Sequence, residues 1–553
     1  MKRLTYIAAL LLFAAINGHA QIERAAKSVF SLTTFKKDGS ILASSHGVFV
    51  SNNGEAICTW TPFVGADYAK VIDANGKEMD VVGIIGANEI YDVCKFKTQA
   101  KTVAAPIAKQ PSKQGDKAWV LLYSVKRPQI EQRNVQSVEQ FMNRYTYYIF
   151  STNMPDNSAS CPFVNAKGEV IGLVQRSKSG DNVYATDARF IDSLTVKNAL
   201  AISDPVLRQT GIPVAYPKDH TQASVMLTLA QEQRDSSKYT RYIDNYLAEF
   251  PTMTEGYAAK ATQQVNANDL DGAEATMLAA ISKTKKKDEA HSAFARIIYQ
   301  EKIYKNDTLH ANWTLENALA EARKAHQINP LPAYLHQQAQ IIYAQGDYPK
   351  ALELFLGLTK TPLRNGEIYY EAAQCKSQMN RPLTEITALL DSAIAASPQP
   401  LNQIGAPYVL ARGTAYFNHG DYRKAVNDFN QYDSLMQGRP LNSGFYYTRQ
   451  QAEMQIHQYQ QALNDINRAI YLTQDSPMLW AEKAQLHYRF NQAQEAVQSA
   501  QMAIRLDPNS TDAYILLGLA QIANKQKAEG LKALQKAKEL GDTRAEEYLN
   551  KYK

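Results

Sequence analysis

The stretch that decides the N-terminal fold is DNSASCPFVNAKGEVIGLVQ, residues 156–175. Small polar residues open it, Pro162 and Gly168 interrupt it, and Glu169–Val174 has the apolar character of a short strand. Similar strand signals recur between residues 27 and 200, for example in Ser28–Phe35, where apolar and polar residues alternate. Short strands separated by turn residues predict an all-β domain of two antiparallel barrels.

The same stretch resembles the nucleophile segment of chymotrypsin-fold serine proteases, in particular the HtrA type, whose pattern is G-N-S-G-G-P-L-V-N-x-x-G-E-V-I-G. When the proline and glycines are aligned, the position of the nucleophilic serine falls on Ala159. The two glycines that follow the serine fall on Ser160 and Cys161, and the oxyanion-hole glycine falls on Asn157. The resemblance therefore implies a protease scaffold that lacks its nucleophile.

Two earlier segments extend the resemblance. HGVFVSNNGEAICTWTPFVGA, residues 46–66, resembles the histidine segment of this family and places the catalytic histidine position on Thr61. IYDVCKF, residues 90–96, resembles the aspartate segment and keeps its aspartate at Asp92. The order of the two positions and their separation match the family, so one member of the catalytic triad survives.

These replacements predict a loss of catalysis. A serine nucleophile needs a general base within hydrogen-bond reach and a group that orients the base. Threonine at position 61 cannot accept and return a proton near neutral pH, and Ala159 has no nucleophilic atom. Asn157 in place of glycine resists the backbone geometry of an oxyanion hole. Ser158 and Ser160 flank the vacant position and are the fallback nucleophiles of a degenerate but working protease.

Residues 1–20 have the pattern of a cleaved secretory signal peptide. A basic start precedes a short apolar run, and small residues stand just before Gln21. The apolar run is too short to span a bilayer, and no later stretch approaches eighteen apolar residues. We therefore expect an exported protein without a transmembrane segment, periplasmic in a Gram-negative source and secreted otherwise.

Charge and cysteine content exclude several classes of function. A net charge of +6 over 553 residues predicts no nucleic-acid partner. Cys58, Cys94, Cys161 and Cys375 permit disulfides in an exported chain, and a Cys58–Cys94 bond and buried free thiols are both open alternatives. No Cys or His pair has metal-ligand spacing, so neither a metal site nor a cofactor is expected.

The predicted protease-like domain spans residues 21–202, and a proline-bearing linker spans 203–220. Helical periodicity then continues over residues 221–553, with small residues recurring every 34 positions, as at Ala469, Ala503 and Ala537. A 34-residue helix–turn–helix period is the tetratricopeptide pattern. The predicted fold class is therefore multidomain, an all-β chymotrypsin-like domain followed by an all-α tetratricopeptide superhelix.

Two turn motifs support the repeat prediction. Gly346-Asp-Tyr-Pro-Lys-Ala-Leu352 and Gly420-Asp-Tyr-Arg-Lys-Ala-Val426 both match the G-D/N-Y-x-x-A turn of this repeat. The spacing predicts eight or nine helical hairpins from 221 to 544 and a short terminal helix from Thr543.

The first helices of successive hairpins, the A helices, form the concave face with which such repeats hold peptides or protein surfaces. In this register the predicted binding residues are Tyr447, Thr448, Gln451, Gln455, Glu482, Gln485, Tyr488 and Arg489. Two functions follow, from different classes. One is an exported protein-binding scaffold with an inactive protease-like domain, and the other is an atypical serine endopeptidase whose repeats deliver substrates.

Overall fold

The chain is described by a computed structural model over residues 19–552, except residues 152–153, 155–157, 176–181 and 306–312. It divides into two compact units, residues 1–293 and residues 294–553, called here the first and second units. Most of the predicted signal peptide and Asn157, the predicted oxyanion-hole position, lie outside the described residues.

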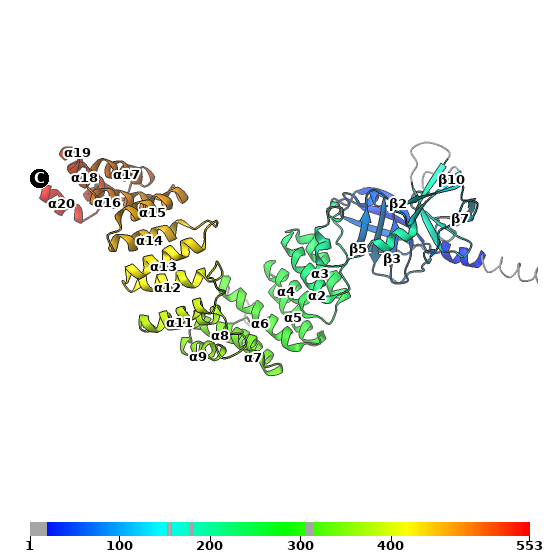
Figure 1. Cartoon of the computed structure of the whole chain (residues 1–553), viewed down its shortest axis with the longest axis horizontal. Coiled ribbons are helices and arrows are strands. Elements are labelled where there is room, and N and C mark those ends of the chain that lie inside the picture. The colour runs from blue at the N-terminus through cyan, green and yellow to red at the C-terminus, as the bar shows by residue number, and fades with distance from the viewer. Residues whose placement is uncertain (1–18, 152–153, 155–157, 176–181, 306–312, 553) are drawn as a thin grey trace, which may run out of the picture. The chain divides into compact units, whose positions relative to one another are not determined.

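Six strands near the start of the first unit close into a barrel in the order β1-β2-β3-β6-β5-β4 (Figure 1). They are β1 (Val29–Phe35), β2 (Ile41–Phe49), β3 (Glu55–Cys58), β4 (Tyr68–Ile72), β5 (Glu78–Asn88) and β6 (Val93–Thr98). Buried and partly exposed residues alternate along β1, as expected for a strand with one face toward a core. The turn before β3 needs Gly54, because its φ is +86° and an added Cβ would lie 2.5 Å from the Thr98 carbonyl oxygen.

The second half of the β region is a seven-stranded antiparallel sheet in the order β8-β7-β11-β12-β13-β10-β9. Its strands are β7 (Lys117–Leu122), β8 (Gln129–Asn134), β9 (Ser137–Phe141), β10 (Tyr145–Ser151), β11 (Pro162–Val164), β12 (Val170–Gln175) and β13 (Asn182–Asp187). One apolar cluster fills this sheet, and a second cluster joins it to the first barrel, for example through Val29 and Leu173. The predicted all-β domain is confirmed, as a closed barrel followed by a larger sheet.

From residue 220 onward the described chain is built of helices α2 to α20. They are α2 (His220–Glu232), α3 (Ser236–Glu249), α4 (Thr254–Asn266), α5 (Leu270–Lys283), α6 (Lys287–Tyr304), α7 (Leu315–Ile328), α8 (Pro332–Ala344), α9 (Tyr348–Leu358), α10 (Gly366–Gln378), α11 (Leu383–Ala395), α12 (Ala406–Asn418), α13 (Tyr422–Leu435), α14 (Ser443–Gln455), α15 (Tyr459–Leu472), α16 (Pro477–Arg489), α17 (Ala493–Leu506), α18 (Thr511–Ala523), α19 (Lys527–Glu539) and α20 (Arg544–Tyr552). Within the described residues these helices follow one another in pairs, from α2/α3 to α18/α19, and the terminal helix α20 comes last (Figure 1). None of these helices is both long enough and apolar enough to cross a membrane.

The hairpin turns explain the repeat motifs. Most turns between paired helices hold one residue with a left-handed backbone, and these residues recur at 34-residue intervals, as at Arg234 and Asn268, at Gly346 and Asn380, and at His457, Asn491 and Lys525. In the two G-D-Y motifs the glycine takes this conformation, and the aspartate after it caps the second helix. The Asp347 carboxylate accepts a hydrogen bond from the Lys350 N–H, and Asp421 does the same for Lys424.

Small residues allow the two helices of a hairpin to pack closely. Ala469, Ala503 and Ala537, which share one repeat position, are fully buried. At Gly518 on α18, an added Cβ would lie 2.7 Å from Leu534 Cγ on α19. The 34-residue period of small residues is therefore a packing requirement of the hairpins.

The segment 203–220, predicted from sequence as a linker, is hydrogen-bonded to the first barrel. The Ile84 N–H of β5 donates to the Pro213 carbonyl oxygen at 2.9 Å, and the Ala215 N–H donates to the Ile84 carbonyl oxygen at 2.8 Å. Apolar side chains of the barrel, of this segment and of α2 and α3 form one continuous core. The β domain predicted at residues 21–202 thus shares its core with the first helices of the repeat region.

Candidate functional site

The positions of the catalytic histidine and aspartate of the protease-like domain lie in contact. Thr61 begins the short 3-10 helix η1 (Thr61–Phe63), and its backbone N–H donates to Asp92 Oδ1 at 2.7 Å. The Thr61 hydroxyl donates to the same oxygen at 2.9 Å. Asp92 itself has a left-handed φ of 46° between β5 and β6. The carboxylate that would orient a histidine is therefore bonded to a side chain that cannot act as a general base.

The segment at the nucleophile position is buried. Ser158 and Ala159 are 4% and 8% exposed, and Ser160 is fully buried with a φ of 67°. The Ser160 hydroxyl oxygen accepts a hydrogen bond from the Thr59 N–H at 3.1 Å. It also lies within hydrogen-bond distance of the Thr59 hydroxyl, 2.6 Å, and the Ser45 hydroxyl, 3.1 Å. Ser160 thus ties this segment to the first barrel, which is a structural use of the hydroxyl.

The cysteines of the β domain are buried free thiols in this structure. Burial raises the pKa of Cys161 to about 12, so the thiol stays protonated and unreactive near neutral pH. Cys58 on β3 lies opposite Cys94 on β6, and burial raises the pKa of Cys58 well above its ordinary value. Of the two alternatives weighed from sequence, this structure contains the free thiols.

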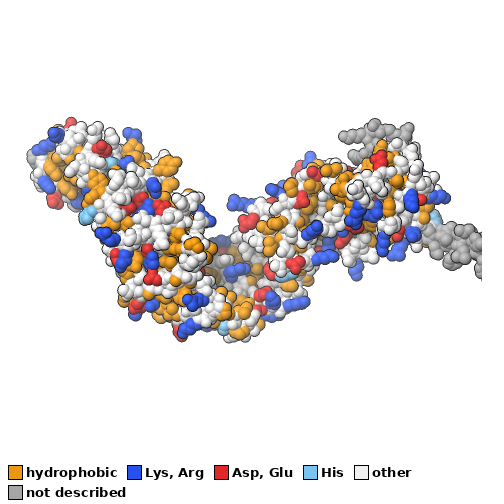
Figure 2. Space-filling view, viewed as in Figure 1, with side chains coloured by type: hydrophobic (Ala, Val, Ile, Leu, Met, Phe, Trp, Pro, Cys, Tyr) orange, Lys and Arg blue, Asp and Glu red, His pale blue; other side chains and the backbone are white. Residues whose placement is uncertain are grey.

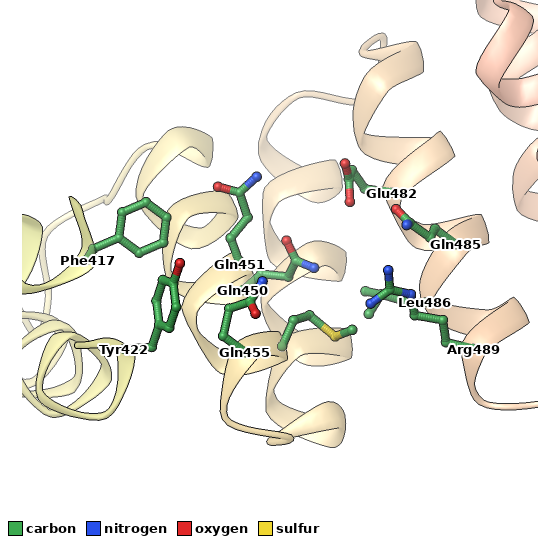
Figure 3. A pocket seen from close by; sticks show the side chains of 10 residues that line it. Phe417, Tyr422, Gln450, Gln451, Gln455, Glu482, Gln485, Leu486 and Arg489 are labelled. Carbon is green, nitrogen blue, oxygen red and sulfur yellow. The ribbon is translucent and has the colours of Figure 1, made fainter. Parts of the chain in front are cut away.

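The second unit contains a pocket of about 300 Å³ between successive A helices, α12, α14 and α16 (Figure 3). Five of the eight predicted binding residues line it: Gln451 and Gln455 from α14, and Glu482, Gln485 and Arg489 from α16. The other lining residues are Phe417, Tyr422, Gln450, Met454 and Leu486. In Figure 3 the α14 side chains lie in the middle of the pocket and the α16 side chains lie on one side of it. Phe417 and Tyr422 lie on the opposite side.

The polar lining of this pocket, the glutamine pocket, is suited to amide groups. Gln450 is 2% exposed, and its Oε1 accepts no hydrogen bond from the described residues. A buried acceptor without a donor is costly, so a ligand N–H that reached it would gain the missing bond. Burial raises the pKa of Glu482, which also accepts a weak hydrogen bond of 3.5 Å from the Tyr447 hydroxyl. Glutamine amides can both donate to and accept from a polypeptide backbone.

The structure does not bring the other three predicted binding residues into this pocket. Tyr488 packs against the apolar cluster of α18, α19 and α20, which includes Leu534. Tyr447 packs against the cluster of α15 and α16. The Thr448 hydroxyl donates to the Gly444 carbonyl oxygen of its own helix at 2.9 Å. The predicted single groove lined by Tyr447, Tyr488 and Arg489 is therefore not formed. Tyr488 precedes Arg489 by one residue, and adjacent residues of a helix point in different directions, so Tyr488 faces the next hairpin.

The sequence patterns do not indicate the aromatic wall of the glutamine pocket, formed by Phe417 and Tyr422, or its buried acceptor, Gln450 Oε1. Tyr422 belongs to the G-D-Y motif, which predicts a turn and by itself indicates no binding role. Phe417 stands three residues before that motif, at the end of an A helix. The shared turn could have indicated that both rings lie beside the next A helix.

The comparisons with known proteins are partial. No protein-family model matches the chain. The chain is 24% identical over 253 residues to the DnaJ homolog subfamily C member 7 homolog of Dictyostelium discoideum, a match that covers 44% of this chain and 46% of that protein. The chain thus spans about half the length of this curated relative. The serine endoprotease from Yersinia pestis is a similar solved structure, with a TM-score of 0.28 and 16% identity over 34% of this chain and 66% of that one.

The structure itself supports the protease-like and repeat-like assignments. A closed six-stranded barrel precedes a second antiparallel sheet, and the two catalytic positions that sequence alignment gave to Thr61 and Asp92 meet between strands. The helices form tetratricopeptide-like hairpins with a 34-residue period. The chain therefore combines a serine-endoprotease-like β domain with tetratricopeptide-like repeats.

Proposed function

We propose that this chain is an exported scaffold that binds polypeptides through its repeats and carries a protease-like domain without proteolytic activity. The observation that carries the proposal is the glutamine pocket, in which four glutamines, a glutamate and an arginine face an apolar wall. Amide and charged groups match a polypeptide backbone, and Phe417, Tyr422, Met454 and Leu486 offer a surface for an apolar side chain.

The inactivity of the protease-like domain is supported by the contacts at its former catalytic positions. Thr61 donates two hydrogen bonds to Asp92 Oδ1, and the hydroxyl of Ser160 lies within hydrogen-bond distance of the Thr59 and Ser45 hydroxyls. Ser158 is the remaining fallback nucleophile, and it is 4% exposed. Catalysis by Ser158 would need a general base within hydrogen-bond reach, and the position aligned with the catalytic histidine holds Thr61. An atypical endopeptidase is therefore the weaker alternative.

The surface supports a protein partner more than a nucleic acid. On the face in Figure 2, basic and acidic side chains are interspersed among apolar ones over the described residues. The face in this view therefore lacks the single-sign field that steers phosphate backbones. The proposal of export rests on the signal-peptide pattern of residues 1–20. If it is correct, intact-mass analysis of the protein from its native source should give a chain that begins at Gln21.

Binding can be tested with a fluorescent, permanently unfolded protein such as reduced and carboxymethylated lactalbumin. We expect saturable binding to the full mature chain. Gln451→Ala and Arg489→Ala together should weaken it about thirtyfold, because anchors in a pocket contribute about 2 kcal/mol. Thr448→Ala is the matched control on α14, since its hydroxyl bonds only its own helix. Equal loss in the control, or no binding by the wild type, would contradict the proposal.

A further inference from the structure

A second pocket in the second unit repeats the polar frame of the glutamine pocket. It has a volume of about 300 Å³ and lies among α6, α8, α9 and α10. Its lining residues are Tyr299, Gln340, Tyr343, Phe355, Tyr370, Glu371 and Gln374. We call it the tyrosine pocket.

The two pockets are equivalent in the repeat. Three polar residues of the tyrosine pocket each stand 111 residues before a counterpart in the glutamine pocket: Gln340 and Gln451, Glu371 and Glu482, Gln374 and Gln485. The partners of the glutamates are equivalent too, because His336 stands 111 residues before Tyr447. His336 Nε2 is hydrogen-bonded to Glu371, as the Tyr447 hydroxyl is to Glu482. A shared frame at the same helix positions indicates a recurring recognition site.

The pockets differ in charge. The glutamine pocket has Arg489 at its edge, whereas the equivalent residue beside the tyrosine pocket is the neutral, exposed Gln378. The described lining of the tyrosine pocket contains the Glu371 carboxylate and no lysine or arginine. The side chain of Glu371 is 15% exposed, so its charge is only weakly screened by water. The tyrosine pocket therefore favours a cation.

Three tyrosine rings complete the lining. Burial, and then the nearby Glu371 carboxylate, raise the pKa of Tyr299, so this ring remains a neutral phenol. Tyr343 and Tyr370 are held from outside the pocket by ring contacts, at 5.2 Å with Tyr348 and 5.8 Å with Tyr408. Aromatic faces attract cations, and sites for ammonium groups commonly combine such faces with a carboxylate.

We propose that the tyrosine pocket binds an alkylammonium group, as at the end of a lysine side chain in a polypeptide held by the repeats. An ammonium fits better than a guanidinium. The oxygens of Glu371 already accept hydrogen bonds from Gln340, at 2.8 Å, and from His336, which disfavours the paired contacts of an arginine. The polypeptide part of this inference rests on the proposed function, and the ammonium site does not.

The direct test is the binding of n-butylammonium to the full mature chain, followed by ligand-observed NMR. We expect saturable binding that n-butanol does not reproduce. Glu371→Gln removes the negative charge, keeps the size of the side chain and should weaken binding about tenfold or more. Gln378→Arg places a cation at the position equivalent to Arg489 and should weaken binding by a similar factor. Glu353→Gln and Gln501→Arg are charge-matched controls at exposed helix positions and should bind like the wild type.

The inference is overturned if butylammonium shows no saturable binding. It is also overturned if the pocket variants and their controls bind butylammonium with equal affinity, provided that all of them melt at the wild-type temperature. A second arm compares one labelled peptide carrying lysine with the same peptide carrying norleucine. Preference for lysine that is lost in Glu371→Gln supports the polypeptide ligand. Butylammonium binding without any peptide binding supports the ammonium site and contradicts the proposed function.

Discussion

Ser160 stands where the protease pattern has a glycine, and its backbone keeps the conformation that glycine favours, with a φ of 67°. The cost of this conformation is offset by hydrogen bonds to Thr59 and Ser45. Ser160→Ala keeps the strained left-handed backbone but loses the hydrogen bonds of the hydroxyl. It should lower the free energy of unfolding by about 1 to 3 kcal/mol. Ser160→Gly loses the same bonds but relieves the strain, so it should be milder by about 1 kcal/mol. Denaturant titration of both variants measures the difference, and equal losses would contradict a strained Ser160.

Glu453 on α14 gives the second unit a pH dependence. Burial, and then the Asp465 carboxylate, raise its pKa to about 8. The folded chain therefore holds this proton at pH values where the unfolded chain releases it, and stability falls as pH rises from about 4.5 to 8. Glu453→Gln mimics the protonated form and should remove a decline of about 1 to 3 kcal/mol from the second unit across that window. Chemical denaturation at several pH values tests this, and parallel profiles for both proteins would contradict it.

The hairpins tolerate added volume at some glycines and not at others. Gly518→Ala on α18 would press a Cβ against Leu534 Cγ at 2.7 Å and the Gly530 carbonyl oxygen at 2.8 Å. It should destabilise the protein by about 1 to 3 kcal/mol. Gly357→Ala on α9 meets nothing within 4 Å and should stabilise by up to about 1 kcal/mol through helix propensity. Thermal melts of the two variants should shift in opposite directions, and a shared direction would contradict the assigned packing.

Elements whose contacts are local in sequence could be predicted, and those fixed by distant contacts could not. The 34-residue period gave the hairpins and the turns, because each turn and each helix pair such as α18 and α19 lies within one repeat. The contact of Thr61 with Asp92 followed from alignment to a known pattern. By contrast, the docking of Pro213 beside β5 and the rotation of Tyr488 toward α18 depend on tertiary packing that no local pattern reports. The 34-residue period does not indicate the tyrosine pocket, because its polar frame recurs in the glutamine pocket at an interval of 111 residues.

The first unit should fold only with its helices. The core of the barrel also contains Ile212, Val214 and tyrosines of α3 such as Tyr242. The Arg241 guanidinium also bonds Asp67 of the barrel at 3.1 Å. A 21–202 fragment would expose this core, so we expect a loss of cooperative unfolding and aggregation, whereas a 21–285 fragment should unfold cooperatively. Circular dichroism melts compare the two fragments, and an equally stable 21–202 fragment would contradict this expectation and support the domain boundary predicted from sequence.

Labelling with a serine-directed reagent tests whether the protease-like domain has lost its catalytic nucleophile. The purified mature chain is incubated with a fluorophosphonate, and its intact mass is compared with that of an active trypsin-like protease treated in parallel. With Thr61 and Ala159 in place of the base and nucleophile, we expect no adduct on this chain and complete labelling of the protease. A stoichiometric adduct that disappears in Ser158→Ala or Ser160→Ala would show a working nucleophile and contradict an inactive protease-like domain.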